Sequence, residues 1–112
     1  MSYTKAKLKL SDAIEAIASS AHPTIQQRLA IAFLFHLRSL EPEELPIQVK
    51  SEFRELKNKL TRNPVKDGAA TTFATITAMS LEESVATIKD LIHISHVVAA
   101  EHQRLVELLT LP

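Results

Sequence analysis

The sequence predicts an all-α protein, a helical bundle of about five helices that ends in a long C-terminal helix. Apolar residues recur at helical spacing along most of the 112-residue chain. The prolines and the one glycine, Gly68, stand between these segments rather than inside them. Apolar residues make up 46% and charged residues 23%, which is the composition of a folded globular domain. We expect a single helical domain over residues 11–112, preceded by a basic N-terminal arm over residues 1–10.

The first two helices are marked by capping residues and a proline. Ser11 can cap a helix over residues 12–20, in which two isoleucines and an alanine share one face. Pro23 ends this helix, and Thr24 begins a second one with the spacing of a capping box. Residues 29–37 are apolar on nearly every side, which is typical of a helix enclosed by other helices. We place this second helix at the centre of the core.

Two shorter helices and a loop follow. Pro42 and Pro46 open a third helix that ends near Leu60, because proline suits a first helical turn and breaks an interior. One narrow side of this helix is apolar and the rest is charged, so it should lie on the surface. Residues 62–68 collect turn-forming residues and predict a flexible loop. A threonine-rich helix is expected over residues 70–79.

The last predicted helix is longer than the domain is wide. Ser80 and Glu83 have the spacing of a second capping box, and no proline or glycine interrupts the helical pattern up to about Leu109. Such a helix would be about 43 Å long, whereas a compact chain of this size is only about 35 Å across. The helix must therefore overhang the bundle, bend or meet a partner.

The same helix carries an apolar arc that approaches half of its circumference. One neighbouring helix cannot cover an arc of that width. Either the first three helices cover it within one chain, or a helix of another copy does, and we favour the second explanation. His102 lies at the edge of the arc, where it could set the register of a helix pair. The predicted interface residues are Leu91, Ile94, Val98, His102, Leu105 and Leu108.

Charge is balanced overall but is divided between the two halves of the chain. Thirteen basic residues offset thirteen acidic ones. Residues 1–66 hold eleven Lys and Arg against seven Asp and Glu, a charge of +4, and residues 67–112 hold two against six, a charge of −4. The halves can cancel by packing on each other. The alternative is head-to-tail attraction between subunits or partners.

Several classes of active site lack their defining residues. Phosphate-binding loops need several glycines and thiolate chemistry needs cysteine, whereas the chain has one glycine and no cysteine. No Gly-x-Ser-x-Gly turn presents a serine nucleophile. We therefore predict no catalytic activity and no cofactor. The chain shows no secretory signal and no apolar run of membrane length, so we expect a cytoplasmic protein.

The histidines give two further hypotheses. His93 and His96 can share one helical face, but two imidazoles are too few to hold a metal ion unless another subunit adds ligands. His36 falls on the buried face of the second helix, where we expect a core histidine with a hydrogen-bond partner. The functional alternative is a small enzyme in which Glu15 or another carboxylate pairs with His36 as a general base.

The charge pattern of the third helix gives a second hypothesis for the function, which is nucleic-acid binding. Its basic side chains, together with the basic arm, could contact phosphates. Glutamates interrupt this patch, however, and the chain has one tyrosine and no tryptophan on which bases could stack. We therefore favour a solvated face and keep nucleic-acid binding as the alternative. The possible contacts are Lys50, Arg54, Lys57 and Arg62.

Several segments form one pattern between residues 11 and 95. They are Thr24-Ile25-Gln26-Gln27-Arg28-Leu29, Glu43-Glu44-Leu45-Pro46, Phe53, Leu60-Thr61 and Met79-Ser80-Leu81-Glu82-Glu83. This pattern resembles that of short, uncharacterised bacterial helical proteins. The resemblance implies no particular activity. With the apolar arc of the last helix, the sequence predicts an interaction or regulatory module of the bacterial cytosol that acts through helix–helix association. Its partner would be a second copy, as a homodimer, or another helical protein.

Overall fold

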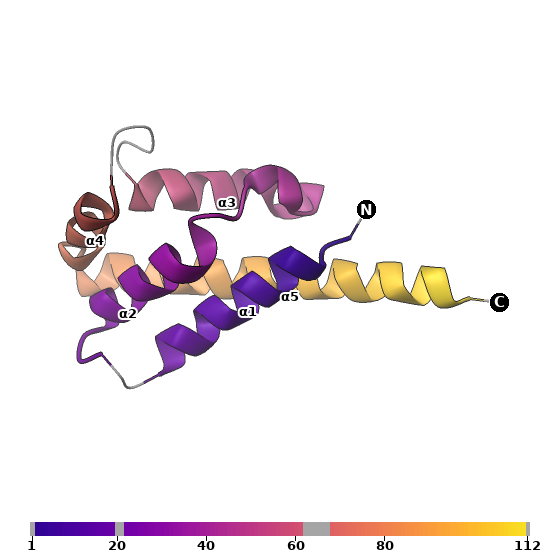
Figure 1. Ribbon diagram of the computed structural model, residues 1–112, viewed down its shortest axis with the longest axis horizontal. Coiled ribbons are helices and arrows are strands. Elements are labelled where there is room, and N and C mark those ends of the chain that lie inside the picture. The colour runs from indigo at the N-terminus through magenta and orange to yellow at the C-terminus, as the bar shows by residue number, and fades with distance from the viewer. Residues whose placement is uncertain (1, 20–21, 62–67, 112) are drawn as a thin grey trace.

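The computed structural model describes residues 2–19, 22–61 and 68–111. The five α-helices are α1 (Thr4–Ala18), α2 (Ile25–Ala32), α3 (Ile47–Leu60), α4 (Ala69–Thr77) and α5 (Leu81–Thr110) (Figure 1). A π-helical turn, η1 (Phe33–Leu37), continues α2, and a 3₁₀ turn, η2 (Pro42–Glu44), precedes α3. The predicted all-α fold of five helices with a long C-terminal helix is confirmed.

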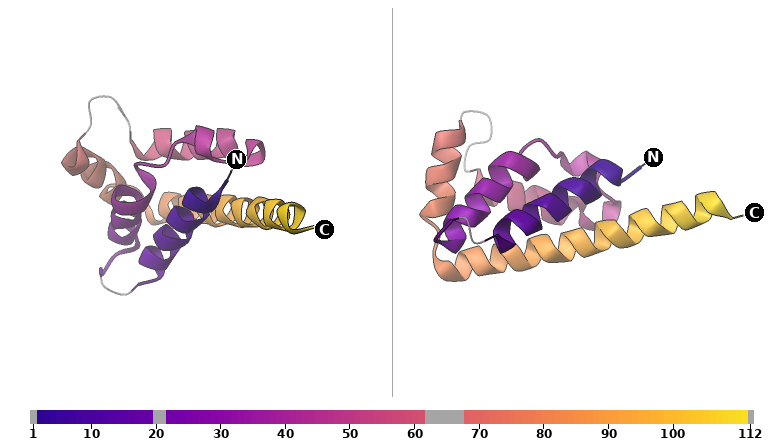
Figure 2. Two further views of the ribbon diagram at one scale, coloured as in Figure 1. Left: turned by 45° about the vertical axis from the view of Figure 1, so that its right-hand side comes forward. Right: turned by 60° about the horizontal axis from the view of Figure 1, so that its bottom comes forward.

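The helix α5 runs along the longest dimension of the molecule, whose extents are 52 × 31 × 21 Å. The other helices lie on one side of it, as the right-hand view of Figure 2 shows. The helices α1, α2 and α3 pack directly on α5, and α2 also packs on α1 and α4. The C-terminal part of α5 continues past the other helices, so the helix overhangs the bundle, which was one of the three outcomes expected from its length.

Every α-helix contributes buried side chains to one core. The large apolar side chains that are almost fully buried are Leu10, Leu29, Phe33, Leu37, Leu40, Leu45, Val49, Phe53, Leu60, Ile76, Leu91 and Ile94. Burying one such side chain contributes about 1.5–3 kcal/mol relative to leaving it in water. The π turn within this core brings Phe33 and Leu37 inward together with Leu29 of α2.

The first helix begins earlier than the sequence indicated. It starts at Thr4 rather than after Ser11, so residues 4–10 form its first turns and not a separate basic arm. Ala6 and Leu10 are buried in the core together with Ala13 and Ile17, because a spacing of three or four residues places all of them on one face. The prediction failed because Ser11 looks like a helix cap, although here it is an exposed residue inside the helix.

The second helix is also less enclosed than predicted. Leu29, Phe33 and Leu37 are fully buried, but Phe35 is 71% exposed. The amide of Arg38 donates to the carbonyl oxygen of Phe33 at 2.8 Å, a spacing of five residues that marks the π turn. The expectation of a helix buried on every side was therefore wrong for this last turn.

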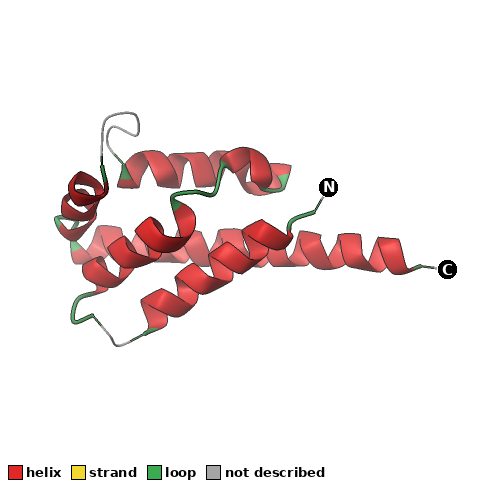
Figure 3. Ribbon diagram, in the orientation of Figure 1, coloured by secondary structure: helices red, strands yellow, loops and turns green. Residues whose placement is uncertain are grey.

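The predicted capping residues begin α2 and α5. The hydroxyl of Thr24 accepts a hydrogen bond from the amide of Gln27 at 3.1 Å, and that of Ser80 accepts from the amide of Glu83 at 3.0 Å. These caps follow short connections, which Figure 3 distinguishes from the helices. Within the described part of the chain, none of the helices is both long and apolar enough to cross a membrane.

Candidate interaction surface

An apolar stripe runs along the side of α5 that faces the other helices. Its fully buried apolar members are Leu91, Ile94 and Val98, and the buried polar residues Ser84 and Thr87 continue the same line towards the start of the helix. At about 100° per residue, Leu105 and Leu109 lie within about 40° of this line and Leu108 lies on its flank. The stripe therefore continues towards the C-terminus of the helix beyond the last fully buried residue.

The cover over this stripe ends before the stripe does. Leu105 is half-buried, whereas Val106, Leu108, Leu109 and Leu111 are 39%, 55%, 83% and 67% exposed. The C-terminal part of α5 extends past the other helices in Figure 1, and these exposed residues lie in its last turns or, for Leu111, directly after them. We call residues 99–111 the projecting end, and the rest of the described chain the body.

The six predicted interface residues fall into two groups. Leu91, Ile94 and Val98 are 0% exposed, so the chain's own helices already cover them and a partner cannot reach them in this fold. His102 and Leu105 are half-buried and Leu108 is exposed, so these three remain accessible. The explanation that the chain's own helices cover the wide apolar arc therefore holds for the first part of α5, whereas the body leaves the second part partly uncovered.

The polar groups of the projecting end are arranged along its sides. The guanidinium of Arg104 donates to the carboxylate of Glu101 at 2.7 Å, and this hydrogen bond raises the pKa of Arg104 above its usual value. The side-chain amide of Gln103 donates to the carboxylate of Glu107 at 3.3 Å. The last turn of α5 contains no basic residue. The exposed leucines thus adjoin polar groups that pair within the helix, and the C-terminal carbonyls have no cation beside them from their own helix.

The predicted nucleic-acid contacts are not arranged as one free basic face. The ammonium of Lys57 donates to the carbonyl oxygens of Leu40 at 2.9 Å and Arg38 at 3.2 Å, and its side chain is only 17% exposed. Arg54 lies 3.6 Å from the carboxylate of Glu43. Lys57 therefore holds the connection after α2. Of the other two predicted contacts, Lys50 is half-buried and Arg62 lies outside the described residues.

His36 lies at the surface of the fold rather than in its core. It is half-buried in η1 and lines a shallow depression with Asp12, Glu15, Ala16 and Ser19 of the neighbouring α1 segment. The proximity of Glu15 matches the pairing considered from the sequence. Because His36 is half-buried at the surface, the prediction of a core histidine was wrong. Among the described residues, no hydrogen bond joins the His36 imidazole to the Glu15 carboxylate, so a general-base pair has no direct support.

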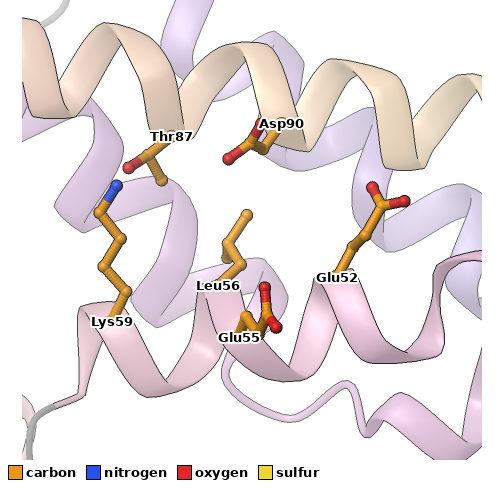
Figure 4. A pocket seen from close by; sticks show the side chains of 6 residues that line it. All are labelled: Glu52, Glu55, Leu56, Lys59, Thr87 and Asp90. Carbon is orange, nitrogen blue, oxygen red and sulfur yellow. The ribbon is translucent and has the colours of Figure 1, made fainter.

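An open cleft of about 410 Å³ lies along the line where α3 packs on α5 (Figure 4). The side chains of α3 that line it are Glu52, Glu55, Leu56 and Lys59, and those of α5 are Thr87 and Asp90. At one end of this acidic cleft the imidazole of His93 lies 3.6 Å from the carboxylate of Glu52. His96, three residues after His93 on α5, is exposed. No group of three His, Cys, Asp or Glu side chains that could hold a metal ion occurs within the ranges described.

The chain was compared with known proteins in three ways. No family model matches it, and no curated protein or solved structure matches it either. The described fold, and the uncovered stripe at the end of α5, therefore carry the functional inference without support from relatives.

Proposed function

We propose that this protein is a small interaction or regulatory module of the bacterial cytosol, without catalytic activity, that acts through helix–helix association of the projecting end of α5. Its first partner is a second copy of the chain, and another helical protein is the alternative. The observation that carries the proposal is the exposure of Leu108 and Leu109 at the end of a helix whose apolar stripe is fully buried at Leu91, Ile94 and Val98. Leu111, just after the helix, is exposed as well. Exposed apolar side chains gathered at one end of a molecule are a common feature of interaction sites on soluble proteins.

The size of the surface indicates a weak and reversible complex. The projecting end offers about three helical turns, so a contact between two such ends buries less than the roughly 1,200–2,000 Å² of a standard stable interface. The gain must also offset the lost freedom of two molecules, which costs at least about 4 kcal/mol. We expect a dissociation constant on the order of 10 μM or weaker. Such an affinity suits a regulatory contact that depends on protein concentration.

Size-exclusion chromatography with light scattering tests this proposal. The wild-type mass should rise from 12.4 kDa towards twice that value as the concentration increases from roughly 1 to 500 μM. Leu108→Glu should remain monomeric at every concentration, because a charge in an apolar contact must be desolvated. The matched control is Leu81→Glu, which changes an exposed leucine in the first turn of the same helix and should dimerise like the wild type.

A monomeric wild-type protein throughout this range would contradict self-association. Equal dimerisation of the Leu108→Glu variant would instead show that the contact lies elsewhere on the molecule. Far-ultraviolet circular dichroism of both variants should match the wild type, because both positions are exposed and lie outside the core.

The alternative function, a nucleic-acid-associated regulator, depends on the basic side chains of α3. Lys57 is tied to the carbonyl oxygens of Arg38 and Leu40 and is largely withdrawn from solvent, whereas Arg54 is exposed with its charge partly offset by Glu43. A binding curve with duplex DNA or RNA decides this. Binding that weakens steeply as salt rises would favour the alternative, because phosphate contacts release counterions.

A further inference from the structure

We infer that two copies pair through their projecting ends in an antiparallel arrangement, with Leu105 of each copy against Leu108 of the other and the two bodies at opposite ends. This inference rests on the proposed self-association and specifies its geometry. It follows from three features of the described chain: the direction of the stripe, the length of the projecting end and the charge at two helix ends.

The direction of the stripe excludes a parallel pair. Leu105 and Leu109 face the same side of α5 as Leu91, Ile94 and Val98, and that is the side on which the body lies (Figure 2). A partner helix that covers the projecting end must therefore lie on the body's side of α5. In a parallel pair, the earlier turns of that partner would occupy the space already filled by α1 and α3. In an antiparallel pair those turns extend away from the body into open solvent.

The length of the projecting end fixes how far the two helices overlap. From Val98, the last fully buried residue of α5, to Thr110, the end of α5, are twelve residues, or about 18 Å. Leu91, Ile94, Val98, Leu105 and Leu108 follow the alternating spacing of three and four that packs helices side by side, except that Glu101 occupies the position between Val98 and Leu105. Placing Leu105 opposite Leu108 also brings the last turn of α5 of one copy level with His102 and Gln103 of the other. The overlap then uses the exposed residues and stops where the body begins.

Charge at the helix ends favours the same arrangement. The helix α1 runs back along α5 in the opposite direction, and its N-terminal end lies towards the projecting end (Figure 1). The first turn of α1 has no acidic residue, and the last turn of α5 has no basic one. An antiparallel pair brings the C-terminal end of α5 to the N-terminal end of the other copy's α1, so the opposite ends of two helix dipoles meet.

Lysines strengthen this complementarity. Lys5 and Lys7 lie in the first two turns of α1 and are both exposed, whereas Glu107 lies near the end of α5. Lys5 is paired with Glu44 at 2.9 Å, which leaves Lys7 as the better candidate for a contact between copies. A second copy thus supplies both the apolar stripe and the charge that each projecting end lacks.

A distance between two spin labels tests the orientation directly. The chain has no cysteine, so Lys89→Cys, at an exposed position on α5, introduces one labelling site per copy. With Leu105 opposite Leu108, the two labelled positions lie about 50 Å apart along the paired helices, at 1.5 Å per residue. A parallel pair would bring them to within about 25 Å, because packed helices lie 8–10 Å apart.

The outcomes separate the arrangement from the self-association on which it rests. A distance near 50 Å at concentrations where light scattering shows a dimer supports the antiparallel pair. A dimer with a short distance overturns the arrangement but leaves the proposed function standing. No measurable distance together with a monomeric mass overturns both.

Disulfide formation provides a second readout of the register. When Leu105→Cys and Leu108→Cys proteins are mixed and oxidised, the disulfide between the two variants should exceed the disulfides within either variant several-fold, because a disulfide needs Cα atoms within about 7 Å. Predominant pairing of each variant with itself would contradict the register.

Lys7→Glu should weaken dimerisation several-fold, whereas Lys89→Glu, remote from the contact, should leave it unchanged. If Lys7→Glu dimerises with the same affinity as the wild type, the proposed contact between Lys7 and the C-terminal end of the other copy's α5 is wrong.

Discussion

The two parts of α5 carry the same apolar stripe but have different surroundings. Over residues 81–98 the stripe is covered by the chain's own helices, and Leu91, Ile94 and Val98 are completely buried. Over residues 99–110 it is half-buried at Leu105 and exposed at Leu108 and Leu109. The helical spacing of apolar residues is therefore the same in the buried and in the exposed part of the stripe. The two parts differ only because the other helices end before α5 does. The first part holds the fold together, and the second is available to a partner.

The largest expected difference between the two parts is in stability. Leu91→Ala should lower the free energy of unfolding by about 2–5 kcal/mol, because it removes buried methyl groups and leaves a cavity. Leu108→Ala should change it by less than about 0.5 kcal/mol when the protein is monomeric. Urea unfolding at low protein concentration measures both values. Equal losses would mean that the projecting end is packed as firmly as the body.

Polar contacts should show the same contrast at smaller size. Lys57→Met should cost about 1–3 kcal/mol of unfolding free energy, since the carbonyl oxygens of Arg38 and Leu40 lose their donor. Arg104→Met breaks the exposed pair with Glu101 and should leave stability unchanged within error. Chemical denaturation checks both. A stable Lys57→Met variant would leave the lysine available for other contacts, including phosphates.

The start of α5 is anchored by a side chain, and its end is not. Ser80→Ala removes the acceptor for the amide of Glu83 and should reduce stability by about 1 kcal/mol. Substitution of Thr110, near the other end, by alanine should have no measurable effect on the monomer, because its hydroxyl bonds only to carbonyl oxygens of the same exposed turn. Thermal unfolding of the two variants tests this. A larger loss of stability from the alanine substitution at Thr110 than from Ser80→Ala would contradict the claim that only the start of α5 is anchored.

The smallest expected effect on stability depends on pH and comes from Glu44, which pairs with Lys5 in the first turn of α1. Hydrogen bonds from the Lys5 ammonium and the Glu41 amide lower the pKa of Glu44 below its ordinary value. A lowered pKa in the folded state contributes stability above the ordinary pKa of glutamate, and this is lost as pH falls through the lowered value. Because the side chain is 32% exposed, we expect only a few tenths of a kcal/mol.

Comparison with Glu44→Gln measures this contribution. The difference in unfolding free energy between wild type and variant should be largest near neutral pH and should shrink as pH falls below the ordinary pKa of glutamate. A difference that stays constant over this range would contradict a stabilising role for the ionised carboxylate.

Much of the fold could be predicted from local signals. Ser80, its partner Glu83 and the uninterrupted pattern after them correctly defined α5, and Thr24 correctly defined the start of α2. The start of α1 was missed because Ser11 has the chemistry of a cap, while the tertiary contacts of Ala6 and Leu10 extend the helix towards the N-terminus. The π turn at Phe33 carries no local sequence signal, so the exposure of Phe35 was not foreseen.

The candidate surface was only half predictable for a physical reason. The sequence places Leu91, Leu105 and Leu108 on one side of a helix, because the spacing alone determines the direction of each side chain. Where the cover ends depends on where α1 and α3 end in space, which is a property of tertiary packing. Leu109, the most exposed leucine of α5, was missing from the predicted interface, although helical spacing alone places it in line with Leu91.

Hydrogen exchange along α5, measured at two protein concentrations, tests the central claim most directly. The amides of residues 85–98 should exchange slowly at both, because the body covers them at any concentration. Those of residues 103–110 should exchange quickly in dilute solution and become protected as the concentration rises and a second copy covers the stripe. Equal exchange of residues 103–110 at both concentrations would contradict the claim that another copy of the chain covers this end.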